Sequence, residues 1–181
     1  MSEEMLVCHC SPTLAGLKTG SLFSCPYSSQ KMIIKEIREF NQKLTQKGIR
    51  IIPVRISDKR MLVYVYRPEK LKEDFSDEKT QIILKCKGYD CTNLSQCICR
   101  LIQKLQSDPD FPHEIGLFLG YPAEDVKGFI ENKAACSKCS GCWKVYGDEQ
   151  AARILFKKYK KCTEIYCRRW KSGVAVEQLT I

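Results

Sequence analysis

The chain has 181 residues, of which 44% are hydrophobic and 28% charged, and its formal net charge is +9. These proportions exclude an intrinsically disordered or fibrous protein, and the length suits one sizeable core. No segment approaches the roughly 20 consecutive apolar residues of a membrane span, and the first residues lack the basic and apolar regions of a secretion signal. We therefore predict a single-domain cytosolic protein that does not associate with membranes.

Twelve cysteines are present in this chain. In a small secreted protein they would suggest a disulfide framework, but cytosolic thiols stay reduced and pack like small hydrophobic side chains. So many thiols, beside 4 methionines and 2 histidines, fit a cell that contains little oxygen. Most of the cysteines are therefore expected to fill the core or the surface.

The first predicted element is a short strand at 5–10, which ends at Pro12 and is followed by a loop or a short helix. On a strand, Cys8 and Cys10 share one face and His9 points to the other. His9 is therefore not expected to activate either neighbouring thiol.

A helix is predicted next, because apolar residues recur with helical spacing after Ser28 and Ser29. Either serine can cap the start of the helix, and Gly48 is typical of a helix end. Two runs rich in β-branched and aromatic residues follow, at 49–56 and 61–66. They are separated by four polar residues and are predicted to form a β-hairpin.

Pro53 lies within the first strand of this hairpin. Proline cannot donate a backbone hydrogen bond, so the strand is expected at a sheet edge or at a bulge.

The pattern turns helical beyond the hairpin, with helices predicted at 68–75, 77–87 and about 93–105. In the last of these, Cys97 falls on the apolar face and Cys99 lies well off it. The two cysteines are therefore a poor pair of metal ligands.

The clearest internal boundary in the chain is the Pro- and Asp-rich stretch at 107–112. Beyond it, residues 114–130 show the pattern of two short helices, with Gly120 at the end of the first and Pro122 at the start of the second. This pattern resembles a helix-turn-helix, but the second helix carries more acidic than basic residues. We interpret the motif as structural, with DNA reading as the alternative.

Cys136, Cys139 and Cys142 have a spacing that lets three thiolates converge on zinc, iron or an iron–sulfur cluster. At the next ligand position of a ferredoxin-type site stands Tyr146. The candidates for a fourth ligand are Cys162, Cys167, Cys10 and His9. The alternative interpretation is a reduced loop that faces the solvent.

Residues 141–146 are predicted to form a strand in which Trp143 belongs to the core, and a helix is predicted from Asp148 onward. Between Arg153 and Lys171 there are eight basic residues and one acidic residue, a charge that can attract a phosphate-bearing partner such as a nucleic acid. The residues assigned to polyanion binding are Lys157, Lys158, Lys160, Lys161, Arg168 and Arg169. The alternative is a solvated helix face.

Three segments, HCSPTLAGLK at 9–18, PHEIGLFLGYP at 112–122 and GCWKVYG at 141–147, resemble the domain of unknown function 3793 family of anaerobic, largely clostridial bacteria. The resemblance spans nearly the whole chain and implies a bacterial cytosolic protein, without an established activity or cofactor. If the three segments meet in space, their polar and aromatic residues line one ligand pocket. These residues are His9, Lys18, His113, Glu114, Tyr121, Trp143, Lys144 and Tyr146.

Together these patterns predict a single α+β domain, with helices covering a small, mainly antiparallel sheet built from 5–10, 49–56, 61–66 and 141–146. The leading functional hypothesis is a non-enzymatic protein that binds a small ligand or responds to a metal. The alternatives are a polyanion-binding protein that uses the basic helix and a small enzyme. The enzyme would be built on His9, Lys18, His113 and Glu114.

Overall fold

A computed structural model describes residues 1–107 and 110–181, which form two compact units. Unit 1 contains residues 1–69 and 159–181, and unit 2 contains residues 70–158. Helices and a small antiparallel sheet confirm the α+β class. That the chain is one folding domain stays a prediction. The boundary predicted at 107–112 lies within unit 2, where residues 108 and 109 are outside the described residues.

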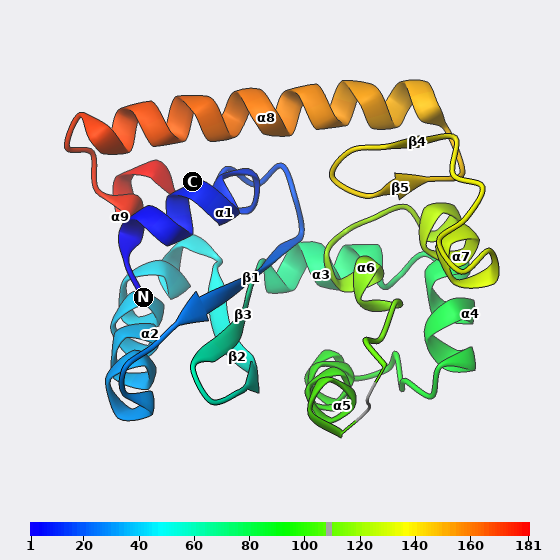
Figure 1. Ribbon diagram of the computed structural model, residues 1–181, viewed down its shortest axis with the longest axis horizontal. Coiled ribbons are helices and arrows are strands. Elements are labelled where there is room, and N and C mark those ends of the chain that lie inside the picture. Colours follow the sequence, from blue (N-terminus) through cyan, green and yellow to red (C-terminus); the bar gives the residue numbers. More distant parts are fainter. Residues whose placement is uncertain (108–109) are drawn as a thin grey trace. The chain divides into compact units, whose positions relative to one another are not determined.

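Unit 1 is built around a three-stranded antiparallel sheet with the order β1-β3-β2 (Figure 1). Its elements are α1 (Glu3–Leu14), β1 (Gly20–Pro26), α2 (Gln30–Leu44), the 3-10 helix η1 (Thr45–Lys47), β2 (Arg50–Ile56), β3 (Arg60–Tyr66) and α9 (Val176–Leu179). The predicted hairpin is β2–β3, and the helix expected after Ser29 is α2. Both predictions are confirmed, and Gly48 has the left-handed conformation (φ 71°) expected at the end of the helical segment.

The strand predicted at 5–10 is wrong, because these residues belong to helix α1. The Ser2 side chain accepts a hydrogen bond from the Met5 backbone N–H at 3.3 Å and caps the helix, which has two acidic residues in its first turn. Leu6, Cys10 and Leu14 recur every four residues and are fully buried on one face. The predicted window of six residues was too short to show this helical period.

The consequence for the thiols in α1 is that Cys8 and Cys10 do not share a face. Cys8 is exposed, whereas Cys10 is buried. Pro12 does not end the helix either, since it lies in the last turn.

Strand β1 was not predicted, because residues 20–26 were expected in a loop or a short helix. Ser21, Phe23 and Cys25 alternate with more exposed neighbours and face the core, which is the period of a strand. The strand pairs along its whole length with β3. Pairing with a distant segment therefore completes the sheet.

Pro53 satisfies both alternatives that were predicted for it. Strand β2 lies at the edge of the sheet, and its register with β3 shifts between Pro53 and Arg55. The edge is covered locally by Asn41 of α2, whose side chain accepts a hydrogen bond from Ile51 N–H at 2.9 Å and donates one to Ile51 O at 2.7 Å. This amide joins α2 to the sheet.

Arg67 follows β3 and donates hydrogen bonds to four backbone carbonyls of unit 1. Its guanidinium reaches Thr13 O and Leu14 O at 2.7 Å each, Ile181 O at 2.6 Å and Lys47 O at 3.2 Å. Carbonyls at helix ends have no partner within the helix and carry partial negative charge. One cation therefore satisfies the ends of α1 and η1 and fastens the C-terminal segment to them.

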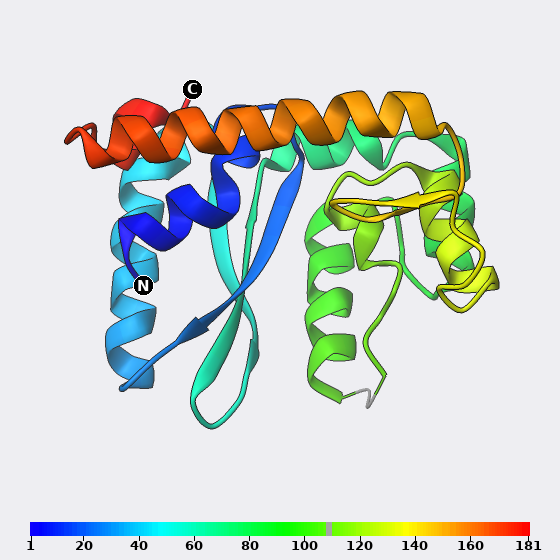
Figure 2. The same ribbon diagram turned by 45° about the horizontal axis from the view of Figure 1, so that its top comes forward.

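Unit 2 is mainly helical and contains a second, two-stranded sheet (Figure 2). Its elements are α4 (Glu78–Cys86), α5 (Leu94–Ser107), α6 (Ile115–Phe118), α7 (Ala123–Glu131), β4 (Cys139–Ser140) and β5 (Lys144–Val145). Helix α3 (Pro68–Asp74) begins in unit 1 and continues into unit 2, and α8 (Glu149–Lys171) is likewise shared. None of the described helices is long and apolar enough to cross a membrane.

The helices predicted in this region are confirmed. Asp77 caps α4 by accepting a hydrogen bond from Thr80 N–H at 2.8 Å, and this lowers the pKa of Asp77. In α5, Cys97 is buried and Cys99 is exposed, as predicted. Gly120, with φ 75°, ends the turn after α6.

The strand predicted at 141–146 is partly wrong. Only residues 144–145 of this range are a strand, and they pair with β4 rather than with the sheet of unit 1. The hairpin closes within a few residues, so its pairing partner is local.

Candidate ligand-binding cleft

Two of the three motif segments, 112–122 and 141–147, meet in unit 2. The ring of Tyr121 stacks on Trp143, with 4.6 Å between centroids and 26° between ring planes, and its hydroxyl donates to Cys142 O at 3.4 Å. Burial, with a smaller contribution from Cys142, raises the pKa of Tyr121 to about 12. Tyr121 is therefore a neutral phenol at physiological pH and acts as a donor.

Asp125 holds the hairpin against α7. It is 3% exposed, and its carboxylate accepts hydrogen bonds from Trp143 Nε1 at 2.7 Å, Tyr146 N at 2.7 Å and Gly147 N at 2.8 Å. A buried carboxylate is stable only where such donors replace its water. Asp125 therefore positions Trp143 and fixes the GCWKVYG segment.

Two glycines of α6 and α7 allow close approaches in this packing. A Cβ at Gly128 would lie 2.4 Å from Cγ of Tyr146, and one at Gly116 would lie 2.8 Å from a methyl of Val126. Neither distance is tolerated between real atoms, so α6, α7 and the hairpin pack at this distance only because both positions are glycine.

A cleft of about 470 Å³ opens beside this packing. Most of its lining is apolar or aromatic, and the charged side chains are few. The lining residues are Phe111, His113, Ile115, Gly116, Leu119, Tyr121, Asp125, Val126, Phe129, Ser140, Cys142, Trp143 and Lys144.

Four of the residues predicted for a ligand pocket line this cleft: His113, Tyr121, Trp143 and Lys144. Trp143 is buried, as predicted, and also contacts Phe156 edge to face at 4.5 Å.

The two basic residues of the cleft lie at different depths. The exposed ring of His113 contacts Phe129 edge to face at 4.9 Å. Half-buried Lys144 donates from Nζ to Ala134 O at 2.5 Å.

Glu114 has a different environment from its neighbour His113. Its buried carboxylate accepts from Lys104 Nζ at 2.7 Å and from the Tyr89 hydroxyl at 3.1 Å, and Lys104 also donates to Lys87 O. Burial favours the protonated acid, but the hydrogen bond and charge of Lys104 outweigh it and lower the pKa of Glu114. Another cavity, of about 710 Å³, is lined by Glu114, Lys104 and Lys87 and shares Phe111 and His113 with the cleft.

Tyr146, also predicted for the pocket, does not line the cleft. Its ring packs against Gly128, and its hydroxyl is buried without a hydrogen-bond partner among the described residues. Sequence reasoning missed Asp125 and the aromatic walls Phe111 and Phe129. The one signal for Asp125 was its place in the first turn of a helix, where acidic residues are common for a different reason.

A family model matches residues 6–180 and carries the description "Protein of unknown function (DUF3793)". The chain belongs to this family. The comparison confirms the resemblance that the three motifs indicate. No curated protein and no solved structure matches the chain.

The third motif of this DUF3793 chain, at 9–18, lies in unit 1. His9 is exposed on α1 and stacks on Phe23, with 5.1 Å between ring centroids. Lys18 lies near Cys10, where its charge partly offsets the burial that raises the pKa of this thiol to about 12. That His9 and Lys18 join the residues of the cleft stays a prediction, and so does an enzyme that combines them with His113 and Glu114.

The predicted metal ligands of this DUF3793 chain are divided between the two units. Cys136 and Cys142 are exposed, Cys139 is half-buried in β4, and Cys162 is buried on α8 in unit 1. Within residues 1–107 and 110–181, no group of three His, Cys, Asp or Glu side chains is arranged to hold a metal ion. Metal binding therefore stays a prediction, which elemental analysis of protein purified without oxygen would test.

The six basic residues predicted to bind a polyanion all lie on α8, and all are exposed. Lys157, Lys161 and Arg168 are four and seven residues apart and follow one line along the helix. The apolar residues of α8 that are buried, such as Tyr159 and Cys162, lie on the opposite face.

Proposed function

We propose that this protein is a non-enzymatic binding protein and that the cleft of unit 2 takes a small organic acid with an aromatic or apolar body. The observation that carries the proposal is the cleft itself, with its apolar and aromatic lining, two basic side chains and a volume of about 470 Å³. Ligand pockets of proteins have this character, with a mostly apolar wall and few polar groups that orient the ligand.

The cleft provides a separate contact for each part of such a ligand. The stacked pair of Tyr121 and Trp143 forms a wall for the apolar body. The Lys144 ammonium uses one of its three N–H donors on Ala134 O, so two donors are left for an anionic group.

The acidic groups near the cleft support binding rather than catalysis. Both oxygens of Asp125 already accept hydrogen bonds, and the carboxylate of Glu114 is engaged by Lys104 and Tyr89. Neither carboxylate is positioned to move a proton of a bound ligand without losing contacts that hold unit 2 together.

A titration with 1-anilinonaphthalene-8-sulfonate, an aromatic anion whose fluorescence rises in apolar surroundings, tests the proposal. We expect saturable binding with quenching of Trp143. Phe111→Ala removes an aromatic wall and should weaken binding about tenfold. Lys144→Met removes the charge but keeps the apolar stem of the side chain. It should therefore weaken binding of the sulfonate and leave binding of the uncharged N-phenyl-1-naphthylamine unchanged.

Ile82→Ala is the matched control, because Ile82 is an exposed apolar residue of unit 2 that does not line the cleft. It should leave both titrations unchanged. Equal affinities for wild type, Phe111→Ala and Ile82→Ala would show that the dye binds elsewhere, and the proposal would be abandoned.

We propose polyanion binding by α8 as a second function. It is supported by the six exposed cations, none of which forms an ion pair with another described residue. Binding of a single-stranded RNA should weaken steeply as salt rises, and replacing Lys157, Lys161 and Arg168 together by Gln should flatten that salt dependence. RNA binding that does not respond to salt, or to the triple replacement, would rule this function out.

We further propose that the protein works in a reducing compartment such as the cytosol of an anaerobic bacterium. All twelve cysteines, each within the described residues, are free thiols. A proteomic survey of thiol oxidation in the source cells would test this: constitutive disulfides would contradict it.

A further inference from the structure

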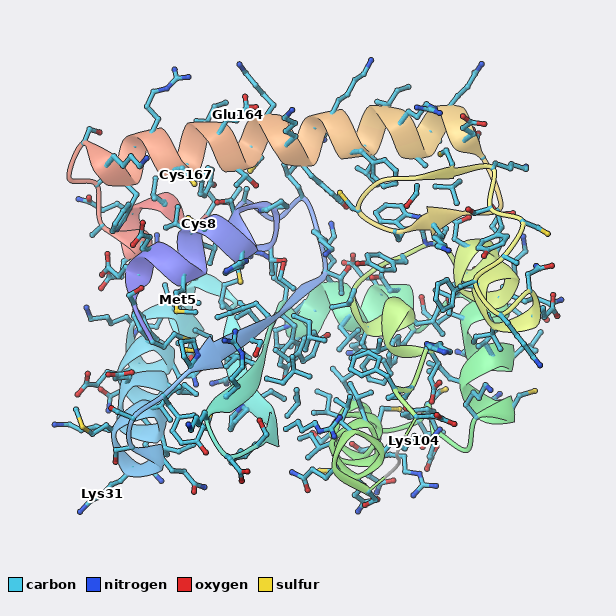
Figure 3. The ribbon with its side chains drawn as sticks, viewed as in Figure 1. Met5, Cys8, Lys31, Lys104, Glu164 and Cys167 are labelled. Carbon is cyan, nitrogen blue, oxygen red and sulfur yellow. The ribbon has the colours of Figure 1, made fainter. Side chains whose placement is uncertain are left out.

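Two thiols that are distant in sequence meet in unit 1. Cys8 of α1 and Cys167 of α8 are 159 residues apart, yet their Sγ atoms are 3.8 Å from each other. Figure 3 shows both side chains between the two helices. A disulfide needs an S–S distance of about 2.05 Å, so the sulfurs would have to approach by less than about 2 Å.

The two thiols differ in their access to solvent. Cys8 is exposed, whereas Cys167 is half-buried. Burial, together with the hydrogen bond and charge of Cys8, raises the pKa of Cys167, while Lys171 opposes the shift. Cys8 is therefore the thiol that an external reagent reaches first, and Cys167 stays protonated beside it.

We propose that Cys8 and Cys167 form a reversible dithiol–disulfide couple that exchanges with small-molecule disulfides. The Cys8 thiolate attacks a disulfide RSSR, forms a Cys8–S–S–R bond and releases RS⁻. The Cys167 thiolate then attacks Sγ of Cys8, and the second RS⁻ leaves. The protein loses two protons and two electrons, and RSSR is reduced to two RSH.

The second step is promoted by the first. Once Cys8 is in a mixed disulfide, its sulfur has neither a proton nor a charge to place beside Cys167. Two of the influences that raise the pKa of Cys167 are thereby removed, while Lys171 still favours its thiolate. Cys167 therefore becomes a better nucleophile at the moment when its target is in contact with it.

Other thiols of the chain are less suited to this chemistry. Cys91 and Cys97 also influence each other's pKa, but Cys97 is buried, its thiol donates to Asp90 O at 2.9 Å, and its pKa is raised to about 12, chiefly by burial. Cys10 and Cys162 are buried, and burial raises the pKa of each. The Cys8–Cys167 pair combines an exposed thiol with a partner in contact.

The test incubates the reduced full-length protein with oxidised glutathione, blocks free thiols with N-ethylmaleimide and maps peptides by mass spectrometry. We expect a peptide that joins Cys8 to Cys167 and is lost on reduction. In Cys167→Ser the reaction should stop at glutathionylated Cys8, whose yield should rise about tenfold over wild type.

Cys8→Ser and Cys8→Ala should both abolish the link. Cys99→Ser, which alters an exposed thiol of α5, is the control that should preserve it. Stable glutathionylation of wild-type Cys8 without a link to Cys167 would overturn the proposal, and so would links formed mainly by Cys136, Cys139 or Cys142. These outcomes are independent of ligand binding in the cleft.

Discussion

Each unit of this protein is organised by one charged side chain that serves backbone groups, but the two charges have opposite signs. In unit 1, Arg67 donates to four carbonyls at helix ends and at Ile181. In unit 2, Asp125 accepts from two backbone N–H groups and the indole of Trp143. The cation gathers helix ends around an aliphatic core, and the anion holds a short hairpin beside an aromatic cleft.

The difference supports the proposal that unit 2 binds the ligand. The core of unit 1 combines residues from α1, α2, α9 and all three strands of its sheet. Unit 2 instead keeps an accessible cleft, and its walls depend on Asp125 and on close packing at two glycines. Replacing either charged side chain therefore tests this difference between the units. The larger loss of stability is expected for Asp125, which is the more buried of the two.

Asp125→Ala should lower the free energy of unfolding by about 4 to 5 kcal/mol, because it leaves three donors without a partner, of which the Trp143 indole is buried and the two backbone N–H groups are partly buried. Urea denaturation measures this loss. Asp58→Ala, an exposed loop substitution, should change stability by less than about 0.5 kcal/mol. A loss below about 1 kcal/mol in Asp125→Ala would mean that the hairpin does not depend on this carboxylate.

Amide hydrogen exchange in Asp125→Ala also tests whether the chain is a single domain. If unfolding is cooperative throughout, exchange should accelerate in both units. Acceleration confined to residues 70–158 would instead make unit 2 a separate domain.

Arg67→Met should lower the free energy of unfolding by about 3 to 4 kcal/mol. This loss is somewhat smaller than that of Asp125→Ala, because Arg67 is partly exposed and water can replace some of its contacts. Arg67→Lys should recover little of this loss, since one ammonium cannot reproduce the fork of the guanidinium. Thermal unfolding of both variants gives the comparison. Full recovery by lysine would show that charge, rather than the geometry of the four hydrogen bonds, stabilises unit 1.

Gly128→Ala should destabilise the protein by about 1 to 3 kcal/mol through overlap with the base of the Tyr146 ring. The sign of this change in stability is informative, because replacing glycine by alanine inside a helix normally stabilises a protein by up to about 1 kcal/mol. Chemical denaturation of Gly128→Ala in the Tyr146→Gly background, which also removes the Tyr146 Cβ at 2.6 Å, should restore the normal sign. A stabilising effect in the wild-type background would mean that the hairpin moves aside easily.

The smallest effect is expected for the pH dependence that Glu114 contributes. The pKa of Glu114 is lowered in the folded protein, so its contribution is fully present above the unfolded value of about 4.3 and is lost as pH falls through the folded pKa. Glu114→Gln should therefore flatten the acid side of the stability profile, measured by urea denaturation from pH 3 to 7 in steps of about one unit. An unchanged acid limb would remove Glu114 from this role.

Much of the fold was predictable because its signals are local. The hairpin β2–β3, helices α2 to α5 and the pair α6–α7 each have a clear period with Gly, Pro or a capping residue at their ends. Strand β1 was missed, because its seven residues become a strand through pairing with β3 rather than through their own preference. Helix α1 was missed, because the short apolar run at its start fits the period of a strand as well as that of a helix.

The site was predictable only where motif residues also line the cleft. His113, Tyr121, Trp143 and Lys144 were found through their motifs. Asp125 and Arg67 were missed, because most of their partners are backbone groups and no spacing of side chains in the sequence reports such contacts. The contact between Cys8 and Cys167 likewise depends on the tertiary fold.

The division of unit 1 between two stretches of sequence has a consequence for biosynthesis. The ribosome makes all of residues 70–158 before it reaches the segment that contributes Val176 and Leu179 to the core of unit 1. At about 5 to 20 residues per second, this interval lasts on the order of 5 to 20 seconds. During that time the nascent α1 and its sheet expose apolar surface, which makes them a natural client for a ribosome-associated chaperone.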